Sequence, residues 1–253
     1  MTAIIAVANH KGGSGKTTTT YHLGKSLAAA GLATLLIDLD DQATLTWRLG
    51  ALDETRRSVA SQPTISDVLD GYALDAAVCV ADDDDHLAYI PADHRLSWIA
   101  AKLQATSPNH NHLRRAWNNS TADFDVVLLD CAPSAGVLLV NALALASHLI
   151  IPSLPTAESY DAAHRMVNMA TEVGDALRSP VQVLGNIITM VSPSSATETY
   201  FITLLEREGS LGRIPRRVGI TGPDLIAEAY APIAAHLAAT VADANTRRIN
   251  HAA

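Results

Sequence analysis

A glycine-rich loop near the start of the chain constrains its fold more than any other feature. Residues 11–18 read Lys-Gly-Gly-Ser-Gly-Lys-Thr-Thr, between an apolar run at residues 3–8 and a segment with helical periodicity. Glycines allow successive backbone N–H groups to point into one concavity, and the following helix adds its positive N-terminal end. The pattern predicts a strand, a phosphate-binding turn and a helix, in that order.

The loop also offers side chains to a nucleotide. We expect Lys16 to reach the β- and γ-phosphates and the hydroxyl of Thr17 to contact Mg²⁺. The usual pattern has a glycine six positions before this lysine, but His10 stands there and Lys11 follows it. Lys11 adds positive charge where negative charge develops during phosphoryl transfer, so we predict that it reaches the nucleotide of a partner subunit. The alternative is a solvated lysine near a turn.

Aspartates follow two further apolar runs. Residues 33–37 lead into Asp38-Leu39-Asp40-Asp41-Gln42, and residues 126–129 lead into Asp130. An unpaired carboxylate is costly to bury, so Asp130 is predicted to lie near Mg²⁺, with a strand-end cap as the alternative. Spacing alone does not separate Asp38 from Asp40, and either could be a turn residue.

Apolar runs alternate with longer segments of helical period along the chain. This alternation predicts a doubly wound, mostly parallel α/β sheet with helices on both faces. Strands are expected near residues 3–8, 33–38, 87–90, 126–130, 148–152, 183–189 and 213–215. Helices are expected at residues 16–30, 64–70, 95–106, 111–118, 136–146, 159–178, 197–208, 223–229 and 232–246. No repeat or linker divides residues 1–253, so we expect one domain, with the three motifs meeting at one sheet edge.

These motifs resemble those of the ParA/MinD group of deviant Walker ATPases, and of its ParA branch in particular. Residues 38–42 are similar to that family's Asp-x-Asp-x-Gln segment, with aspartate where proline is common. Residues 126–134, Val-Val-Leu-Leu-Asp-Cys-Ala-Pro-Ser, are similar to its Walker B strand and the switch that follows. Residues 87–92 and 214–217 are similar to its later Ile-Pro-Ala and Ile-Pro-Arg segments. The resemblance covers nearly the whole chain.

The resemblance implies a role for each of these residues. Asp40 would position or activate the attacking water, with Lys11 and Lys16 as the other catalytic residues. The metal site would comprise Thr17, Asp38 and Asp130, with Asp38 supporting Mg²⁺ or Thr17 indirectly. The nucleotide site would comprise Lys11, Gly12, Gly13, Ser14, Gly15, Lys16, Thr17, Thr18, Met190 and Pro215.

Four arginines gather late in the chain, at Arg207, Arg213, Arg216 and Arg217. Guanidinium groups can contact DNA phosphates without reading bases. The resemblance implies nonspecific DNA binding by an ATP-bound dimer, although Gly219 stands about where relatives often carry another arginine. The alternative is a solvated surface on which Glu206 and Glu208 partly cancel the charge.

Charge and cysteine content limit which partners and cofactors this chain can bind. A net charge of -8 restricts any DNA contact to a local patch. Cys79 and Cys131 are too far apart for a short redox or zinc motif, which favours a reduced, cytoplasmic protein. We expect no signal peptide, because the first strand begins within about three residues, and no membrane span, because no apolar run reaches about 18 residues. The acidic run at residues 82–85 and the His-Asn-His at residues 110–112 are interpreted as polar loops rather than metal sites.

The expected function is an ATP-driven switch of the DNA-segregation type, nucleoid-associated and without a built-in helix-turn-helix domain. ATP and Mg²⁺ would lie between two subunits, and a ParB-like, centromere-bound adaptor with a basic N-terminal segment would stimulate slow hydrolysis. Three alternatives remain: a MinD-like membrane-positioning ATPase, an iron–sulfur carrier, and an ATPase that positions a protein cargo on the nucleoid. A MinD-like protein should end in a basic amphipathic helix with bulky apolar residues, but residues 238–253 contain no Phe, Trp or Leu. An iron–sulfur carrier would need cysteines paired across a dimer.

Overall fold

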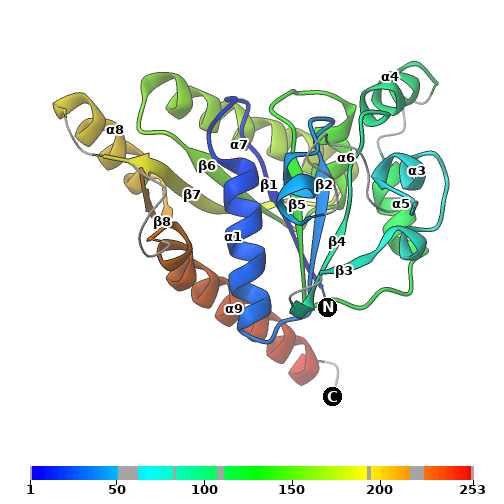
Figure 1. The fold of residues 1–253 in the computed structure, drawn as a ribbon. Coiled ribbons are helices and arrows are strands. Elements are labelled where there is room, and N and C mark those ends of the chain that lie inside the picture. Colours follow the sequence, from blue (N-terminus) through cyan, green and yellow to red (C-terminus); the bar gives the residue numbers. More distant parts are fainter. Residues whose placement is uncertain are drawn as a thin grey trace.

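The computed structural model describes residues 2–50, 62–81, 84–106, 111–192, 195–216 and 225–251. Its strands form one sheet in the order β3-β4-β2-β5-β1-β6-β7-β8 (Figure 1). The strands are β1 (Ala3–Val7), β2 (Thr34–Leu39), β3 (Cys79–Ala81), β4 (Asp84–Ile90), β5 (Val126–Cys131), β6 (His148–Ser153), β7 (Gln182–Val191) and β8 (Ser210–Pro215). β3 and β4 are antiparallel, and all other neighbours in this sheet are parallel. The predicted doubly wound, mostly parallel architecture is confirmed.

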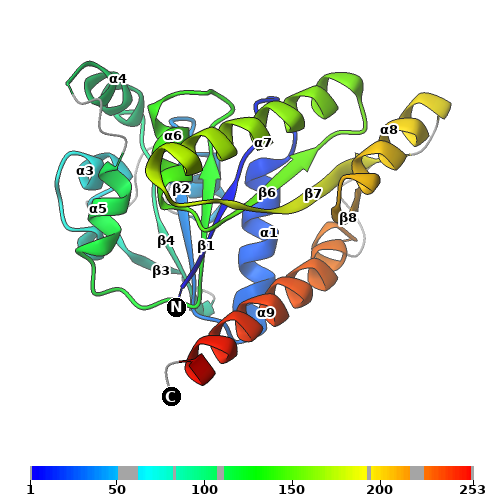
Figure 2. The same ribbon diagram turned by 180° about the vertical axis from the view of Figure 1, so that it is seen from behind.

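Helices cover both faces of the sheet. They are α1 (Lys16–Ala29), α2 (Thr44–Arg48), α3 (Ile65–Leu69), α4 (Leu96–Thr106), α5 (His112–Asn118), α6 (Val137–Leu145), α7 (Ala157–Leu177), α8 (Ala196–Arg207) and α9 (Leu225–His251), with a 3₁₀ turn η1 (Leu74–Ala77). α1 and α9 lie together on one face, and α6 and α7 lie on the other (Figures 1 and 2). α8 and β8 lie at the edge opposite β3 (Figure 2).

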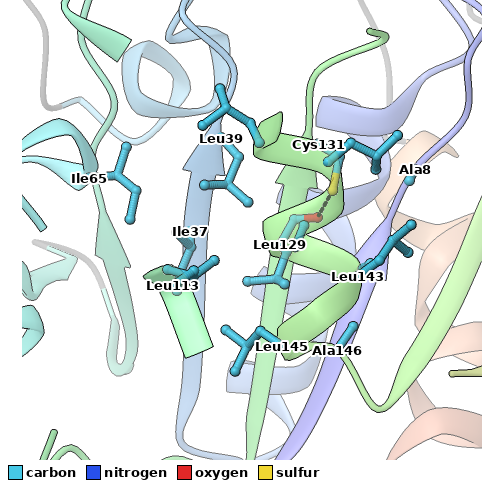
Figure 3. Close-up of a cluster of buried hydrophobic side chains, with 14 of the residues drawn as sticks. Ala8, Ile37, Leu39, Ile65, Leu113, Leu129, Cys131, Leu143, Leu145 and Ala146 are labelled. Carbon is cyan, nitrogen blue, oxygen red and sulfur yellow. Dashed lines mark hydrogen bonds between the residues drawn. The ribbon is translucent and has the colours of Figure 1, made fainter. Parts of the chain in front are cut away.

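The central strands read as continuous apolar runs because both of their faces are buried. Every residue of β1, β2 and β5 is buried. Along β5, Leu129 joins the cluster under α5 and α6, whereas Leu128 joins the cluster under α1 and α9. Figure 3 shows the first cluster, where Ile37 and Leu129 lie among Leu113 and Leu145 from the helix layer. Burial of such a side chain contributes about 1.5–3 kcal/mol.

One expected pair of helices is wrong. Separate helices are expected at residues 223–229 and 232–246, but α9 runs through Pro232 from Leu225 to His251. Residues 223 and 224 lie outside the described part. A proline in a helix removes one backbone hydrogen bond. Tyr230, Ile233 and Leu237 are buried against the core on either side of it, so tertiary packing holds the helix together.

Three short elements were not expected from the sequence. β3, α2 and η1 contain only three to five residues each, too few for a clear periodicity. β3 pairs with β4, whose first residues, Asp84 and Asp85, belong to the acidic run interpreted as a loop. Residues 82, 83 and 110, from the two suspected polar loops, lie outside the described residues.

Candidate nucleotide site

The sheet brings the three predicted motifs together at one edge. β1 lies beside β5, and β5 lies beside β2. In this register Val7 is paired with Asp130, and Asp38 is paired with Asp130 from the other side. The glycine-rich loop leaves the end of β1 and enters α1 at Lys16, at the upper end of α1 in Figure 1.

The glycine-rich loop is supported from the sheet side and open on the other. Gly13 and Gly15 have φ of 70° and 90°, a backbone conformation that favours glycine. A Cβ on Gly15 would lie 3.3 Å from Cγ2 of Thr189, whereas one on Gly13 would meet nothing within 4 Å. Thr189 Oγ1 also donates to the carbonyl of Ser14 at 2.7 Å. The open side therefore has room for phosphates.

Lys16 brings a buried ammonium group to this loop. Its Nζ donates to the carbonyl of Lys11 at 3.3 Å. Burial lowers the pKa of Lys16, and the nearby carboxyl group of Asp130 opposes that shift. A buried ammonium group whose hydrogen-bond partner is a loop carbonyl is well placed to neutralise an anionic ligand.

Asp130 is a buried carboxylate with unused acceptor capacity. Oδ1 accepts from Thr20 Oγ1 at 3.3 Å, and Thr17 also donates to this carboxylate. Oδ2 is buried and has no hydrogen-bond partner among the residues that the structure describes, and the same holds for Ser14 Oγ. Burial, and then the charge of Asp38, raise the pKa of Asp130 well above its ordinary value. These features fit a bound cation such as Mg²⁺, held by Thr17 and Asp130.

Asp38 and Asp40, which spacing could not separate, differ in their surroundings. Asp38 Oδ2 accepts from Thr46 N and Oγ1 at 2.9 and 2.7 Å, and Oδ1 accepts from Asp40 N at 3.1 Å. Asp40 is half-buried, and its Oδ1 accepts from Gln42 N at 3.0 Å. Asp38 therefore anchors the loop, and Asp40 is the less buried carboxylate, close enough to Lys16 and Asp130 to influence the pKa of each.

The buried carboxylates predict how stability depends on pH. Burial raises the pKa of Asp38 from 3.8 to about 6, so the folded chain holds this proton more tightly than the unfolded chain. The stability from this group is complete below about pH 4 and is lost as pH rises through about 6. The raised pKa of Asp130 acts in the same direction. Asp130→Asn should therefore raise the melting temperature of the nucleotide-free protein at pH 7, by about 2–4 °C for each kcal/mol recovered.

Thermal melts at pH 5 and pH 7 measure this effect, and the gain from Asp130→Asn should be larger at pH 7. Asp75→Asn is a control of opposite sign, because hydrogen bonds from Ser120 and backbone N–H groups lower the pKa of Asp75. That variant should melt lower than the parent at pH 7. A melting temperature for Asp130→Asn below that of the parent at pH 7 would contradict the assignment.

Lys11 lies at the entrance of the loop, and its side chain contacts α7. Its Nζ forms an ion pair with Glu158 in the first turn of α7, and this contact lowers the pKa of Glu158. Both side chains are exposed, and exposed pairs are weak. Glu158 was missed in the sequence, where only its place just after an apolar run marks it.

Met190 follows a residue that contacts the loop, and Pro215 lies on the neighbouring strand. Met190 has a φ of 54°, which is strained for a residue with a side chain, and its neighbour Thr189 contacts the loop. Val191 is paired with Pro215 across β7 and β8. No sequence pattern indicates Thr189, whose contact with Ser14 spans 175 positions.

The described arginines of the late cluster lie apart from the phosphate loop, at the β8 edge of the sheet (Figure 2). Arg207 ends α8, and Arg216 follows β8; both are exposed. Arg213 is held by Glu206, because its Nε and Nη2 each lie 2.7 Å from Glu206 Oε1. Arg217 lies outside the described residues.

Comparisons with known proteins identify the family of this chain. A family model described as an AAA domain matches residues 2–183. The chromosome partitioning protein ParA of Caulobacter vibrioides is 34% identical over 189 residues, which cover 74% of this chain and 69% of that protein. The chain belongs to the ParA-like family of partition ATPases. Within this ParA-like group, the maintenance of carboxysome distribution protein A of Synechococcus elongatus is 30% identical over 72% of this chain and 69% of its own length.

A solved structure similar to this ParA-like chain is cobyrinic acid a,c-diamide synthase from Mycobacterium smegmatis. It has a TM-score of 0.79, 29% sequence identity, and coverage of 94% of both chains. That structure contains an ATP analog and magnesium, so the fold is one that binds nucleotide and Mg²⁺.

Two observations bear on the alternatives. None of the helices in the described residues is long and apolar enough to cross a membrane. Cys79 and Cys131 are both buried, and burial raises the pKa of each thiol, to about 11 for Cys79. Buried, protonated thiols are unsuited to hold an iron–sulfur cluster between two subunits.

Proposed function

We propose that this chain is an ATP-dependent switch for DNA segregation. ATP binding closes two protomers face to face, the dimer retains nonspecific DNA, and hydrolysis stimulated by a ParB-like, centromere-bound adaptor releases it. The observation that carries the proposal is that a buried Lys16 and a buried Asp130, one of whose oxygens has no hydrogen-bond partner among the described residues, lie together at an open glycine-rich loop. Membership of the partition ATPase family supports it.

Within one protomer, each site residue has a distinct task. The loop N–H groups and Lys16 would bind the phosphates, and Thr17 with Asp130 would hold Mg²⁺. When bound, Mg²⁺ supplies positive charge to the β- and γ-phosphate oxygens. Asp40 would orient the attacking water, and Asp38 keeps Asp40 in place through its backbone N–H.

Dimer closure would complete the site. Lys11 is a surface cation on a weak ion pair, so a more highly charged phosphate from a partner subunit can replace Glu158. A lysine arriving from the partner would stabilise charge that develops at the γ-phosphate. The two-fold arrangement would make each subunit complete the other's site.

DNA retention would use the β8 edge. Arg207 and Arg216 are exposed there, and the exposed Arg213–Glu206 pair can exchange its carboxylate for a DNA phosphate. With a net charge of -8, the rest of the chain gives little general attraction to DNA. Binding should therefore depend on this local patch and on salt.

The double variant Arg207→Ala with Arg216→Ala tests this patch. With a nonhydrolysable ATP analogue, we expect weaker binding to unrelated DNA fragments and a salt slope smaller by about 0.9 for each lost phosphate contact. Affinity for the analogue alone should not change. Arg114→Ala with Arg115→Ala removes the same charge from α5 and should bind DNA as the parent does. Unchanged retention by the first variant would place the DNA contact elsewhere.

A protein cargo is the second candidate, and the similarity to a carboxysome distribution protein favours it. The ATPase cycle and the nucleoid track would be the same, and only the adaptor would differ. Stimulation of ATP hydrolysis by the product of the neighbouring reading frame, measured with and without DNA, distinguishes the two when that product is also tested for site-specific DNA binding. Binding to anionic lipid vesicles without DNA binding would instead favour a MinD-like role.

A further inference from the structure

A buried chain of polar side chains crosses three adjacent strands beneath the phosphate loop. Asn9 follows β1, Ser153 ends β6 and Asn186 lies in β7, and all three are at most 5% exposed. Asn9 Nδ2 donates to the carbonyl of Pro152 at 2.8 Å and to Ser153 Oγ at 3.3 Å. Ser153 Oγ in turn donates to Asn186 Oδ1 at 3.2 Å. A single hydroxyl therefore links the two amides.

One end of this chain holds the phosphate loop. Asn9 Oδ1 accepts from the backbone N of Lys11 at 2.9 Å. Thr189 Oγ1, which donates to the carbonyl of Ser14, also lies 3.4 Å from the carbonyl oxygen of Ser153. Ser153 thus lies between two contacts that hold the loop, one at Lys11 before Gly12 and one at Ser14 before Gly15.

The other end holds the turn between α8 and β8. The backbone N of Asn186 donates to the carbonyl of Gly209 at 2.9 Å, and its Nδ2 lies 3.4 Å from the same oxygen. The turn is packed closely, because a Cβ on Gly185 would lie 2.9 Å from that oxygen. Arg207 lies at this turn, and the Glu206–Arg213 pair spans it.

We propose that Ser153 and Asn186 couple the phosphate loop to the Gly209 turn, so that nucleotide binding moves the turn that carries the arginines. The physical reason is the cost of breaking a buried polar chain. A donor or acceptor left unsatisfied in the core loses more free energy than one hydrogen bond gains. A shift of the loop backbone at Lys11 is therefore followed by Asn9, Ser153 and Asn186 in turn. The link to DNA rests on the proposed function, but the movement of the turn does not.

Hydrogen exchange tests the coupling without DNA. Amide exchange in the peptide covering residues 206–212 is measured with and without a nonhydrolysable ATP analogue and Mg²⁺. The parent should show a change at this turn, and Ser153→Ala should lose that change while the analogue still protects the loop. Ser153→Thr keeps the hydroxyl and should respond as the parent does.

Ser147→Ala is the matched control. Ser147 directly precedes the same strand at its other end, where its Oγ contacts Ile4 N and O at 3.1 and 3.0 Å. Its loss should leave the response of the turn intact. If Ser153→Ala does not fold, Asn186→Leu interrupts the chain at its other link and should give the same loss.

DNA affinity gives a second readout. When two sites are coupled, binding at one typically changes the affinity of the other by about 5- to 150-fold. We expect the analogue-dependent gain in DNA affinity to fall about tenfold in Ser153→Ala, and the DNA-dependent gain in analogue affinity to fall by the same factor. No change in amide exchange at the turn of the parent, or the same change in Ser153→Ala as in the parent, would overturn the coupling. A responding turn with nucleotide-independent DNA binding would leave the coupling standing and reject the proposed DNA function.

Discussion

Lys16→Ala is expected to weaken ATP binding by about a hundredfold or more. The ammonium group of Lys16 is buried at the base of the loop, and burial lowers its pKa. It donates a hydrogen bond to the carbonyl of Lys11. Hydrogen bonds to charged groups contribute about 1.5–3 kcal/mol each. Since about 1.4 kcal/mol is a tenfold change, contacts with two phosphates predict the stated loss. Titration calorimetry with ATP and Mg²⁺ measures it.

The fold should survive this substitution. The melting temperature should stay close to that of the parent, because the desolvation cost removed with Lys16 offsets the lost attraction to Asp130. Lys25→Ala, a lysine further along the same helix, serves as the control and should bind ATP normally. Near-normal ATP affinity in Lys16→Ala, with the control unchanged, would show that the loop does not bind phosphates as described.

Asp40→Ala is expected to stop turnover while leaving ATP binding in place. Positioned acid–base groups contribute about 10²- to 10⁴-fold to rate, and we expect a loss in that range in single-turnover hydrolysis. ATP affinity should change little, because Asp40 is half-buried and contacts its own loop rather than the phosphate loop. Its neighbour Asp41, which accepts from Gln42 Nε2, provides the control variant Asp41→Ala, with nearly normal turnover expected.

Asp38→Asn distinguishes positioning from chemistry. Asp38 accepts hydrogen bonds from Thr46 and from the backbone N of Asp40, so its variant should lose turnover through displacement of Asp40. Its melting temperature at pH 7 should not fall, because burial raises the pKa of Asp38 and an amide carries no charge. Asp40→Ala should lose turnover while the contacts of Asp38 with Thr46 stay intact. Normal hydrolysis by Asp40→Ala would move the water-positioning role to another carboxylate at this edge, with Asp38 as the next candidate.

The sequence predicted the features that depend on neighbouring residues. The glycine-rich loop, the apolar runs of β1, β2 and β5, and the helix that starts at Lys16 all have local signals. Once those strands are parallel, their carboxyl ends must meet, so Asp38 and Asp130 come together without further information. Long, periodic elements were therefore predicted well, and β3 and α2 were missed because they are short.

Contacts between distant residues were decided only by the tertiary structure. Two helices are expected at residues 223–229 and 232–246, yet burial of Tyr230 and Ile233 keeps α9 continuous through Pro232. Glu158 reaches Lys11 across 147 positions, and Ser153 reaches Asn9 across 144. Local propensity and spacing carry no record of such pairs, because they arise when separate strands and helices pack. By itself, then, the sequence determined the fold class and the phosphate loop, while packing decided which side chains hold that loop and what lies at the other end of them.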